Sequence, residues 1–176
     1  YEGAGVLIKS DGTELRGTFR SGAIYNGIGT LISFDGDRFN GEFLIGNYRI
    51  GELTCVNADV YTGNFVNNKY DGQGVLMRNG DKFEGIFKAG NYFYGTLTTS
   101  YCTFTGSFSD NLYHDPSAAL VLTNGTKYAG GFKKGVYHGF GVLLCNNKQT
   151  KGYFLAGKRV SRFRPNYWFE KRLLSL

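Results

Sequence analysis

The sequence is poor in the residues that mark several protein classes. Its 176 residues include 2 prolines, 2 histidines, 3 cysteines and 1 tryptophan. Beside 27 glycines, so little proline excludes a collagen-like chain and a proline-rich linker. No apolar run approaches the ~20 residues that a membrane-spanning helix needs. Disorder is also disfavoured, because 41% of the residues are apolar and 16% are aromatic.

Cysteine and histidine are too few and too scattered for the usual catalytic sites. Cys55, Cys102 and Cys145 form an odd number without a Cys-x-x-Cys pair, which favours a reducing compartment. His114 and His138 fall at positions unrelated to the cysteines, and a metal site would need more ligands. We therefore predict no catalytic, metal or cofactor site and no enzyme activity. We expect a cytoplasmic location, with cytoskeletal or membrane association as further options.

Acidic residues are nearly absent from one end of the chain. Residues 1–126 hold 9 Lys/Arg and 13 Asp/Glu, a net charge of −4, whereas residues 127–176 hold 11 Lys/Arg and one acid, Glu170, a net charge of +10. The basic end should attract anions, and the rest of the chain should not. An ordinary solvated surface is the alternative interpretation of the same count.

A search for internal repeats reveals the organisation of the chain. The unit begins aromatic-x-Gly-x-aromatic, as in Phe39–Phe43 and Tyr61–Phe65, and seven copies start 21 to 24 residues apart, two of them without the first aromatic. Each unit continues with a second half, clearest as Gly-x-Gly before an apolar pair in 72–76 and 139–143. Asx-Gly turns separate the units and suit positive backbone φ.

The period of two predicts how these residues point. In a strand, positions one, three and five share a face, so two rings flank a glycine. Because glycine weakens a strand by itself, its recurrence indicates that another group approaches closely, and we expect a ring of the neighbouring unit. The Gly-x-Gly half alternates as well, so each repeat should be a hairpin. His114-Asp115-Pro116-Ser117 replaces the Gly-x-Gly of its unit, and its proline should limit strand pairing there.

The cycle of aromatic-x-Gly-x-aromatic, Gly-x-Gly-x-Leu and Asx-Gly resembles the MORN (membrane occupation and recognition nexus) repeat family. The resemblance covers residues 1 to about 158 and implies an antiparallel β solenoid that acts as a scaffold or binding module. We predict an all-β protein, an elongated single-layer antiparallel β solenoid of seven to eight hairpin repeats over residues 1–158. The first unit starts inside a repeat, so we expect the natural chain to extend N-terminally. Residues 159–176 should form a basic extension with a short capping helix after Pro165.

The recurring rings are the candidate binding site. Aligned along the ribbon, they should form an exposed apolar groove for a helix or extended segment of a partner protein, or for a second copy of the chain. Purely structural packing is the alternative for any one ring. The predicted groove consists of Phe19, Phe43, Phe65, Phe87, Phe108, Phe132, Phe154, Phe39, Tyr61, Phe83, Phe104 and Tyr128, with Tyr70 and Tyr137 at its margin.

Two other functions remain open. The first is binding of an anionic membrane or phosphoinositide through the basic end, a property that the family resemblance also suggests. The second is a role as the accessory domain of an enzyme, with the catalytic part elsewhere. Nucleic-acid binding is disfavoured, because the aromatic period belongs to the repeat. The residues predicted to contact lipid are Lys158, Arg159, Arg162, Arg164, Lys171 and Arg172.

Overall fold

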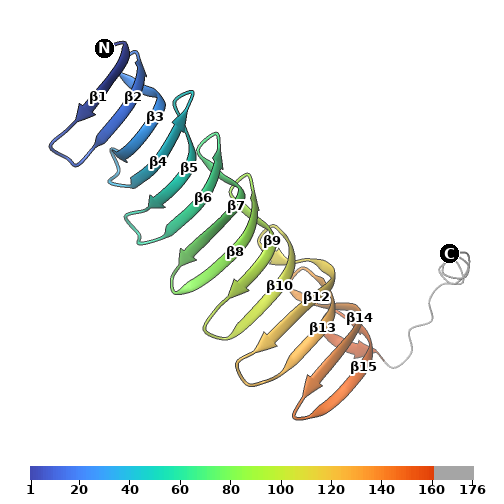
Figure 1. Cartoon of the computed structure of the whole chain (residues 1–176). Helices are drawn as coiled ribbons and strands as arrows, with labels where there is room; N and C mark the ends of the chain where they lie inside the picture. The colour runs from blue at the N-terminus through green and yellow to red at the C-terminus, as the bar shows by residue number, and fades with distance from the viewer. Residues whose placement is uncertain (161–176) are drawn as a thin grey trace, which may run out of the picture.

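A computed structural model describes residues 1–160, and within them the chain forms one long antiparallel sheet (Figure 1). The strands follow one another across the sheet in chain order, except that the two-residue β11 pairs with β10 beside this path. The predicted all-β architecture is confirmed. The strands are β1 (Gly3–Ile8), β2 (Glu14–Arg20), β3 (Ala23–Ile32), β4 (Arg38–Leu44), β5 (Asn47–Thr54), β6 (Val60–Val66), β7 (Lys69–Arg78), β8 (Asp81–Lys88), β9 (Asn91–Thr98), β10 (Cys102–Ser109), β11 (Leu112–Tyr113), β12 (Asp115–Leu122), β13 (Lys127–Lys133), β14 (Val136–Cys145), β15 (Lys148–Leu155) and β16 (Lys158–Val160).

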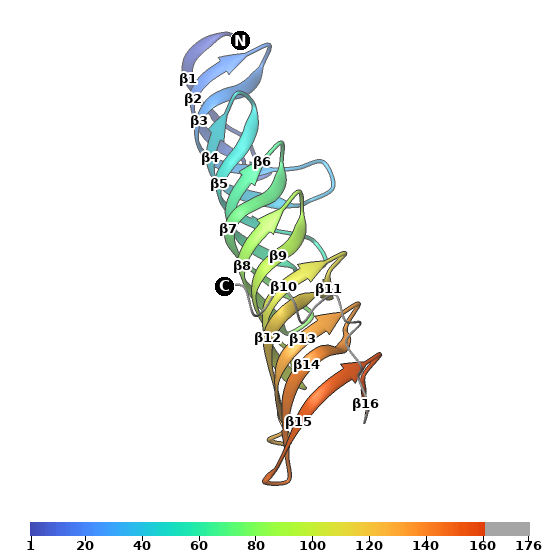
Figure 2. The ribbon, with the colours of Figure 1, turned by 90° about the vertical axis from the view of Figure 1, so that its right-hand side faces the viewer.

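The sheet is bent, and the aromatic rings lie inside the bend. In a straight strand, residues four apart stand about 13 Å from each other, yet the ring centroids of Phe83 and Phe87 are 4.9 Å apart. The strand must therefore fold toward its aromatic face at the intervening Gly85. Figure 2 shows this curvature from the side of the ribbon. The opposite surface, called the outer face below, carries the residues that alternate with the rings.

Paired glycines occupy the bend. Gly85 faces Gly95, and Gly63 faces Gly74, each across one antiparallel pair. A Cβ atom on Gly63 would lie 2.6 Å from the Gly74 Cα and 2.6 Å from the Tyr61 hydroxyl oxygen, which no side chain tolerates. The ring that demands glycine here thus comes from the same strand. The expectation that it comes from the neighbouring unit is wrong, because the bend folds the first ring of each unit over its own glycine pair.

The rings form a continuous array along the ribbon. In one unit Tyr61 stacks on Tyr70 with a centroid distance of 3.8 Å and an interplanar angle of 11°. The next unit closes this pair with Phe87, whose edge meets Tyr61 at 5.0 Å and Tyr70 at 5.8 Å. Four other units repeat the stacked pair, and each pair is closed by the second aromatic residue of the following unit. This array is the core of a sheet that has no second layer among the described residues.

Hydrogen bonds between successive turns reinforce the array. Where the next turn ends in glycine, that glycine donates its N–H to a tyrosine carbonyl one unit earlier, as Gly90 does to Tyr70 at 2.8 Å. Where the turn ends in asparagine, the hydrogen bond runs in the opposite direction. The Asn68 side-chain oxygen accepts from the Tyr48 N–H at 2.7 Å. Asn68 has a φ of 58°, a left-handed conformation that asparagine tolerates better than most residues. Each unit is therefore fastened to the next at its backbone.

The unit with Asp115 and Pro116 departs from the pattern as predicted. The register between β12 and β13 shifts between Asp115 and Ala118, so the ladder is interrupted there. The buried Asp115 carboxylate accepts from the backbone N–H groups of Ser107 and Ser117, both at 2.7 Å. A side chain thus replaces the main-chain partners that the interrupted ladder lacks.

The sheet continues through β16 to Val160, two residues past the predicted end of the array. The predicted capping helix lies outside the described residues.

Candidate functional site

The rings predicted to line an exposed groove are instead buried. Those at the first aromatic position are 0 to 2% exposed, and those at the second are 1 to 6% exposed. The prediction of an exposed aromatic stripe is wrong, because the bend at the glycines closes the aromatic face around its own rings. The buried rings are Phe39, Tyr61, Phe83, Phe104 and Tyr128 in the first row, and Phe19, Phe43, Phe65, Phe87, Phe108, Phe132 and Phe154 in the second.

Tyr70 and Tyr137 lie at the margin of the core, as predicted, but they are half-buried members of the ring stack. Burial disfavours the phenolate, and it raises the pKa of Tyr70 to about 12. Burial also raises the pKa of Tyr137. Both rings therefore belong to the core rather than to an open groove.

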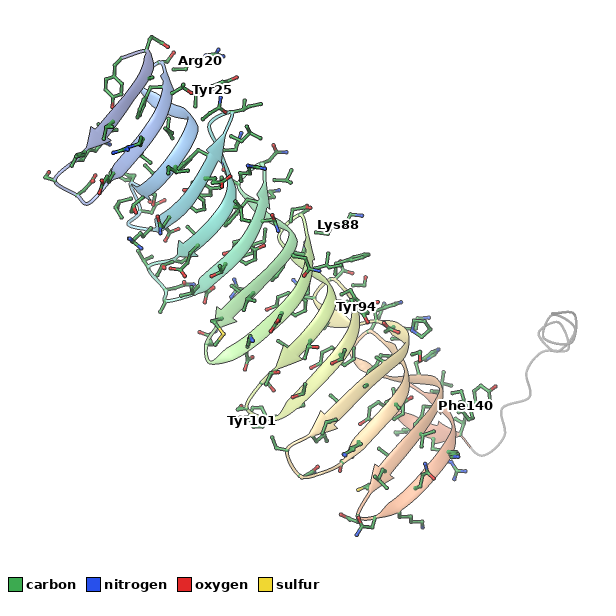
Figure 3. All side chains as sticks on the ribbon, in the orientation of Figure 1. Arg20, Tyr25, Lys88, Tyr94, Tyr101 and Phe140 are labelled. Atoms are coloured by element: carbon green, nitrogen blue, oxygen red, sulfur yellow. The ribbon has the colours of Figure 1, made fainter. Side chains whose placement is uncertain are left out.

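Several exposed apolar residues lie on the outer face, which the sequence-based argument passed over. Tyr94 is 49% exposed and Phe140 is 56% exposed. In Figure 3 both lie toward the same long edge of the ribbon, whereas Tyr101 lies in a turn on the opposite edge. The alternation that predicted the ring rows contained this information, because every second residue of a unit must point away from the rings.

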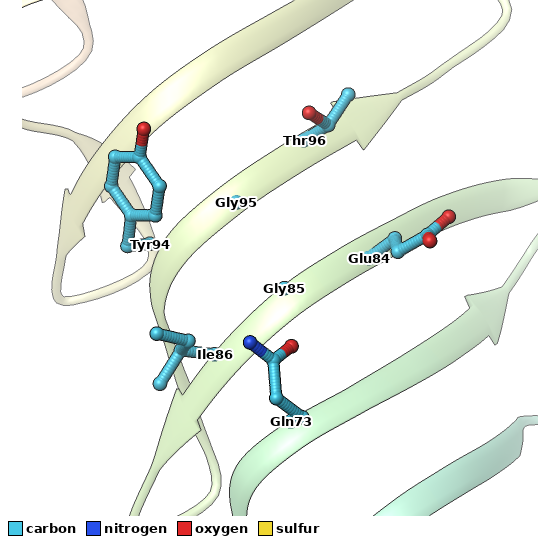
Figure 4. Close-up of a pocket in the computed structure, with 7 residues that line it drawn as sticks. All are labelled: Gln73, Glu84, Gly85, Ile86, Tyr94, Gly95 and Thr96. Atoms are coloured by element: carbon cyan, nitrogen blue, oxygen red, sulfur yellow. The ribbon is translucent and has the colours of Figure 1, made fainter.

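An open pocket of about 570 Å³ lies on the outer face of β7, β8 and β9 (Figure 4). Gly85 and Gly95 provide bare backbone between two rows of side chains. Ile86 and Tyr94 stand directly opposite each other on one side, and Glu84 and Thr96 do so on the other. Gln73 of β7 completes the lining. The pocket thus combines an apolar side with a carboxylate.

Charge divides the described sheet into two regions. Glu84 forms an exposed ion pair with Lys82 at 2.7 Å, and Glu42 forms one with Arg49 at 2.7 Å. Exposed pairs of this kind contribute little to stability, so either side chain can change its partner at little cost. Residues 127–160 carry no acid, and no salt bridge of the described part involves their cations, which are Lys127, Lys133, Lys134, Lys148, Lys151, Lys158 and Arg159.

Within residues 1–160, no three His, Cys, Asp or Glu side chains gather as a metal site would require. The same residues contain no helix long and apolar enough to cross a membrane.

Of the residues predicted to contact lipid, Lys158 and Arg159 are exposed on β16. The other four lie outside the described residues: Arg162, Arg164, Lys171 and Arg172.

Comparison with known proteins agrees with the repeat geometry. Residues 61–82 and 128–150 match the family model of the MORN repeat. No curated protein matches the chain. The matched segments begin at Tyr61 and Tyr128, the first rings of two units that stack and pair in the same way. The same hairpin recurs through the described sheet, and the two matched segments identify the chain as a MORN repeat protein.

Proposed function

We propose that this chain is a non-catalytic scaffold that binds a partner protein through its outer face, at the pocket beside Tyr94. The observation that carries the proposal is an exposed tyrosine next to a half-buried Ile86 on a sheet that the ring array holds in shape. A rigid aromatic side chain at the centre of a surface is the kind of residue that dominates protein interfaces. The MORN family, whose members mostly act as scaffolds or binding modules, supports this assignment.

The lining of the pocket defines the chemistry of the partner. Tyr94 and Ile86 offer contact to an apolar side chain, and Glu84 on the other side favours a positive charge. The two groups are separated by the glycine backbone, so one partner segment can satisfy both. We therefore expect a segment that carries an apolar anchor close to a lysine or arginine.

Capture of partners on the immobilised chain tests the proposal. Replacing Tyr94 with alanine should weaken binding at least tenfold, or about 1.4 kcal/mol, without lowering the melting temperature, because the side chain is exposed. Tyr101→Ala is the matched control, since Tyr101 is 77% exposed on the opposite edge. Equal loss in both variants, or in neither, would contradict the assignment of the site.

A second candidate function, association with an anionic membrane, rests on the seven cations and no acid of residues 127–160. Each basic residue near an anionic leaflet contributes about 1 kcal/mol, which salt screens. Cosedimentation with vesicles containing phosphatidylserine tests it at low salt. Reversing Lys158, Arg159, Arg162 and Arg164 to glutamate should abolish sedimentation. Unchanged sedimentation of the variant, or none of the wild type, would remove this function.

A further inference from the structure

We infer that the partner of the outer face is a second copy of this chain, packed face to face and antiparallel, with its two-fold axis at Ala119. This inference rests on the proposed function, because it uses the same surface and names its occupant.

The strand registers place seven outer-face residues in one line across β8 to β15. Successive pairs in the ladder connect each residue of the line to the next. The line begins with the acid Glu84 and ends with the base Lys151, and Ala119 stands in its middle. In order it consists of Glu84, Thr96, Thr105, Ala119, Ala129, Val142 and Lys151.

A two-fold axis parallel to the strands makes this line complementary to itself if it runs midway between the two sheets, level with Ala119. Rotation by the axis reverses the order of the strands but leaves each residue at its height along them. Glu84 of one copy then faces Lys151 of the other, twice in the dimer. Between these two contacts the facing residues are uncharged and mostly small, so the convex outer faces of two copies can approach closely along this line.

A second set of outer-face residues stands two positions from this line, across the bend glycines, and it matches in the same register at both ends, although the pairing between β10 and β14 is interrupted at this height. It contains Ile86 and Tyr94, which pair with each other, and Phe140 and Tyr153, which do likewise. The same rotation sets Tyr94 opposite Phe140 and Ile86 opposite Tyr153. The exposed aromatic residues of the outer face thus meet one another, and their apolar surface leaves water.

A third line lies on the other side of the first line from Ile86 and Tyr94, and it brings no like charges together. Its cations are Lys82 and Lys127, and the rotation sets Lys82 opposite Gln149 and Lys127 opposite Thr103. No like charges face each other across the interface.

The polar groups along the first two lines, together called the strip below, keep or replace their hydrogen-bond partners when the interface forms. The hydroxyls of Thr96 and Thr105 already bond each other at 3.0 Å, so neither loses its partner when water is excluded. Glu84 exchanges only its exposed contact with Lys82 for Lys151 of the second copy.

The size of the strip predicts a weak dimer. The two lines that carry the complementarity cross seven strands at ~4.8 Å and are about 13 Å wide, which is smaller than the ~800 Å² per partner of a standard interface. Because opposite charges fix the register, we expect the dimer to dissociate as ionic strength rises.

Sedimentation equilibrium of the purified full chain at about 50 mM and 500 mM salt tests the inference. The wild type should dimerise at low salt and become at least tenfold weaker at high salt. Glu84→Lys alone and Lys151→Glu alone should each weaken the dimer at least tenfold, because each sets like charges opposite each other. The double variant Glu84→Lys/Lys151→Glu restores opposite charges at both contacts, and its dissociation constant should return to within about threefold of the wild type.

The charge swap separates this interface from other forms of association. Pairing through the open edges of β1 or β16 would not respond to either single variant. Single variants that dimerise like the wild type, or a double variant that fails to recover, would overturn the inference. A wild type that stays monomeric at low salt would overturn it too, while the proposed scaffold function would still stand if Tyr94→Ala, but not Tyr101→Ala, loses a captured partner.

Discussion

At the scale of single residues, close contacts with the paired backbone and, at several positions, with a ring of the same hairpin restrict most glycines of the bend to glycine. Tyr61 lies over Gly63 and Gly74 so closely that a Cβ on either would strike the ring. Not every glycine of the row is so confined. Gly5 of β1 has no atom closer than 4.0 Å to a built Cβ, and the nearest atoms belong to the Phe19 ring. The row thus contains both tight and open positions.

This difference gives a first prediction. Gly63→Val should destabilise the fold by about 3 kcal/mol, because the branched side chain must displace backbone as well as the Tyr61 ring. Gly5→Ala, at an equivalent position in the ladder with ordinary φ, should change stability by less than about 0.5 kcal/mol. Chemical denaturation of both variants measures the two values. Similar losses would show that close contact is not what excludes side chains from the bend.

Asp115 gives a prediction about pH. Burial by itself would raise the pKa of this carboxyl, but hydrogen bonds from Ser117 and Ser107 outweigh burial and hold the pKa below its ordinary 3.8. A group whose pKa is lower in the folded chain stabilises the fold above the unfolded pKa and loses that contribution as the pH falls through the folded pKa. The wild type should therefore exceed Asp115→Asn in stability by about 2 kcal/mol at pH 7.

Below about pH 3.8 the difference between the two proteins should shrink. The measurement is urea denaturation from pH 7 down to pH 2.5, and a difference independent of pH would contradict the role assigned to the carboxylate.

At the scale of the hairpin, the sequence predicted the strands but not their shape. The spacing of Phe83, Gly85 and Phe87 correctly placed both rings on one face, and it could do so because strand alternation is a local property. Whether that face is open depends on a sharp bend, which arises only when rings and glycine pairs from two strands pack together. Exposure is therefore a tertiary property, and the groove assigned from spacing alone was wrong.

Tyr94 and Ile86 show the converse case. Their outward direction follows from the same alternation, but their place beside each other depends on the register of β8 with β9, which the length of the intervening turn sets.

The charge contrast between Glu84 and Lys151 was visible in the sequence as an uneven count. That Glu84 and Lys151 lie on one line across the sheet follows only from the register of every strand pair between β8 and β15, which the sequence alone does not give.

The asparagine turns supply a prediction at this scale. Asn68→Ala removes the acceptor for the Tyr48 N–H and places alanine at a φ of 58°, so we expect a loss of about 2 kcal/mol. Asn68→Gly removes the same side chain without backbone strain and should lose roughly half as much. Thermal melts of both variants measure the difference. If glycine proves as damaging as alanine, the backbone conformation contributes nothing to the choice of asparagine.

At the scale of the whole molecule, the ribbon behaves as a row of units that each contact only their neighbours. Phe87 touches rings of its own unit and of the preceding one, and none farther away. In such arrays, stability is close to a sum of units and junctions. Damage to one junction should therefore remain local.

Phe87→Ala tests this property. The ring is 1% exposed, so its removal should cost about 3 to 5 kcal/mol. Hydrogen exchange should accelerate in β6 to β9 and change little in β13 to β15. Uniform acceleration along the ribbon would indicate that the array unfolds as one cooperative block.

The closure of each stacked pair by a ring from the following unit also makes the regular units that share this pattern interchangeable. A chain lacking residues 61–82 would bring Phe87 onto the pair of Phe39 and Tyr48, where Phe65 now lies. Each deletion or duplication of a hairpin would shorten or lengthen the ribbon by about 10 Å without altering the interior of any other unit. X-ray scattering of the shortened chain would reveal this step. The distance between two partners bound at opposite ends of the ribbon would then be set by the number of hairpins, and it would change only in steps of one hairpin length.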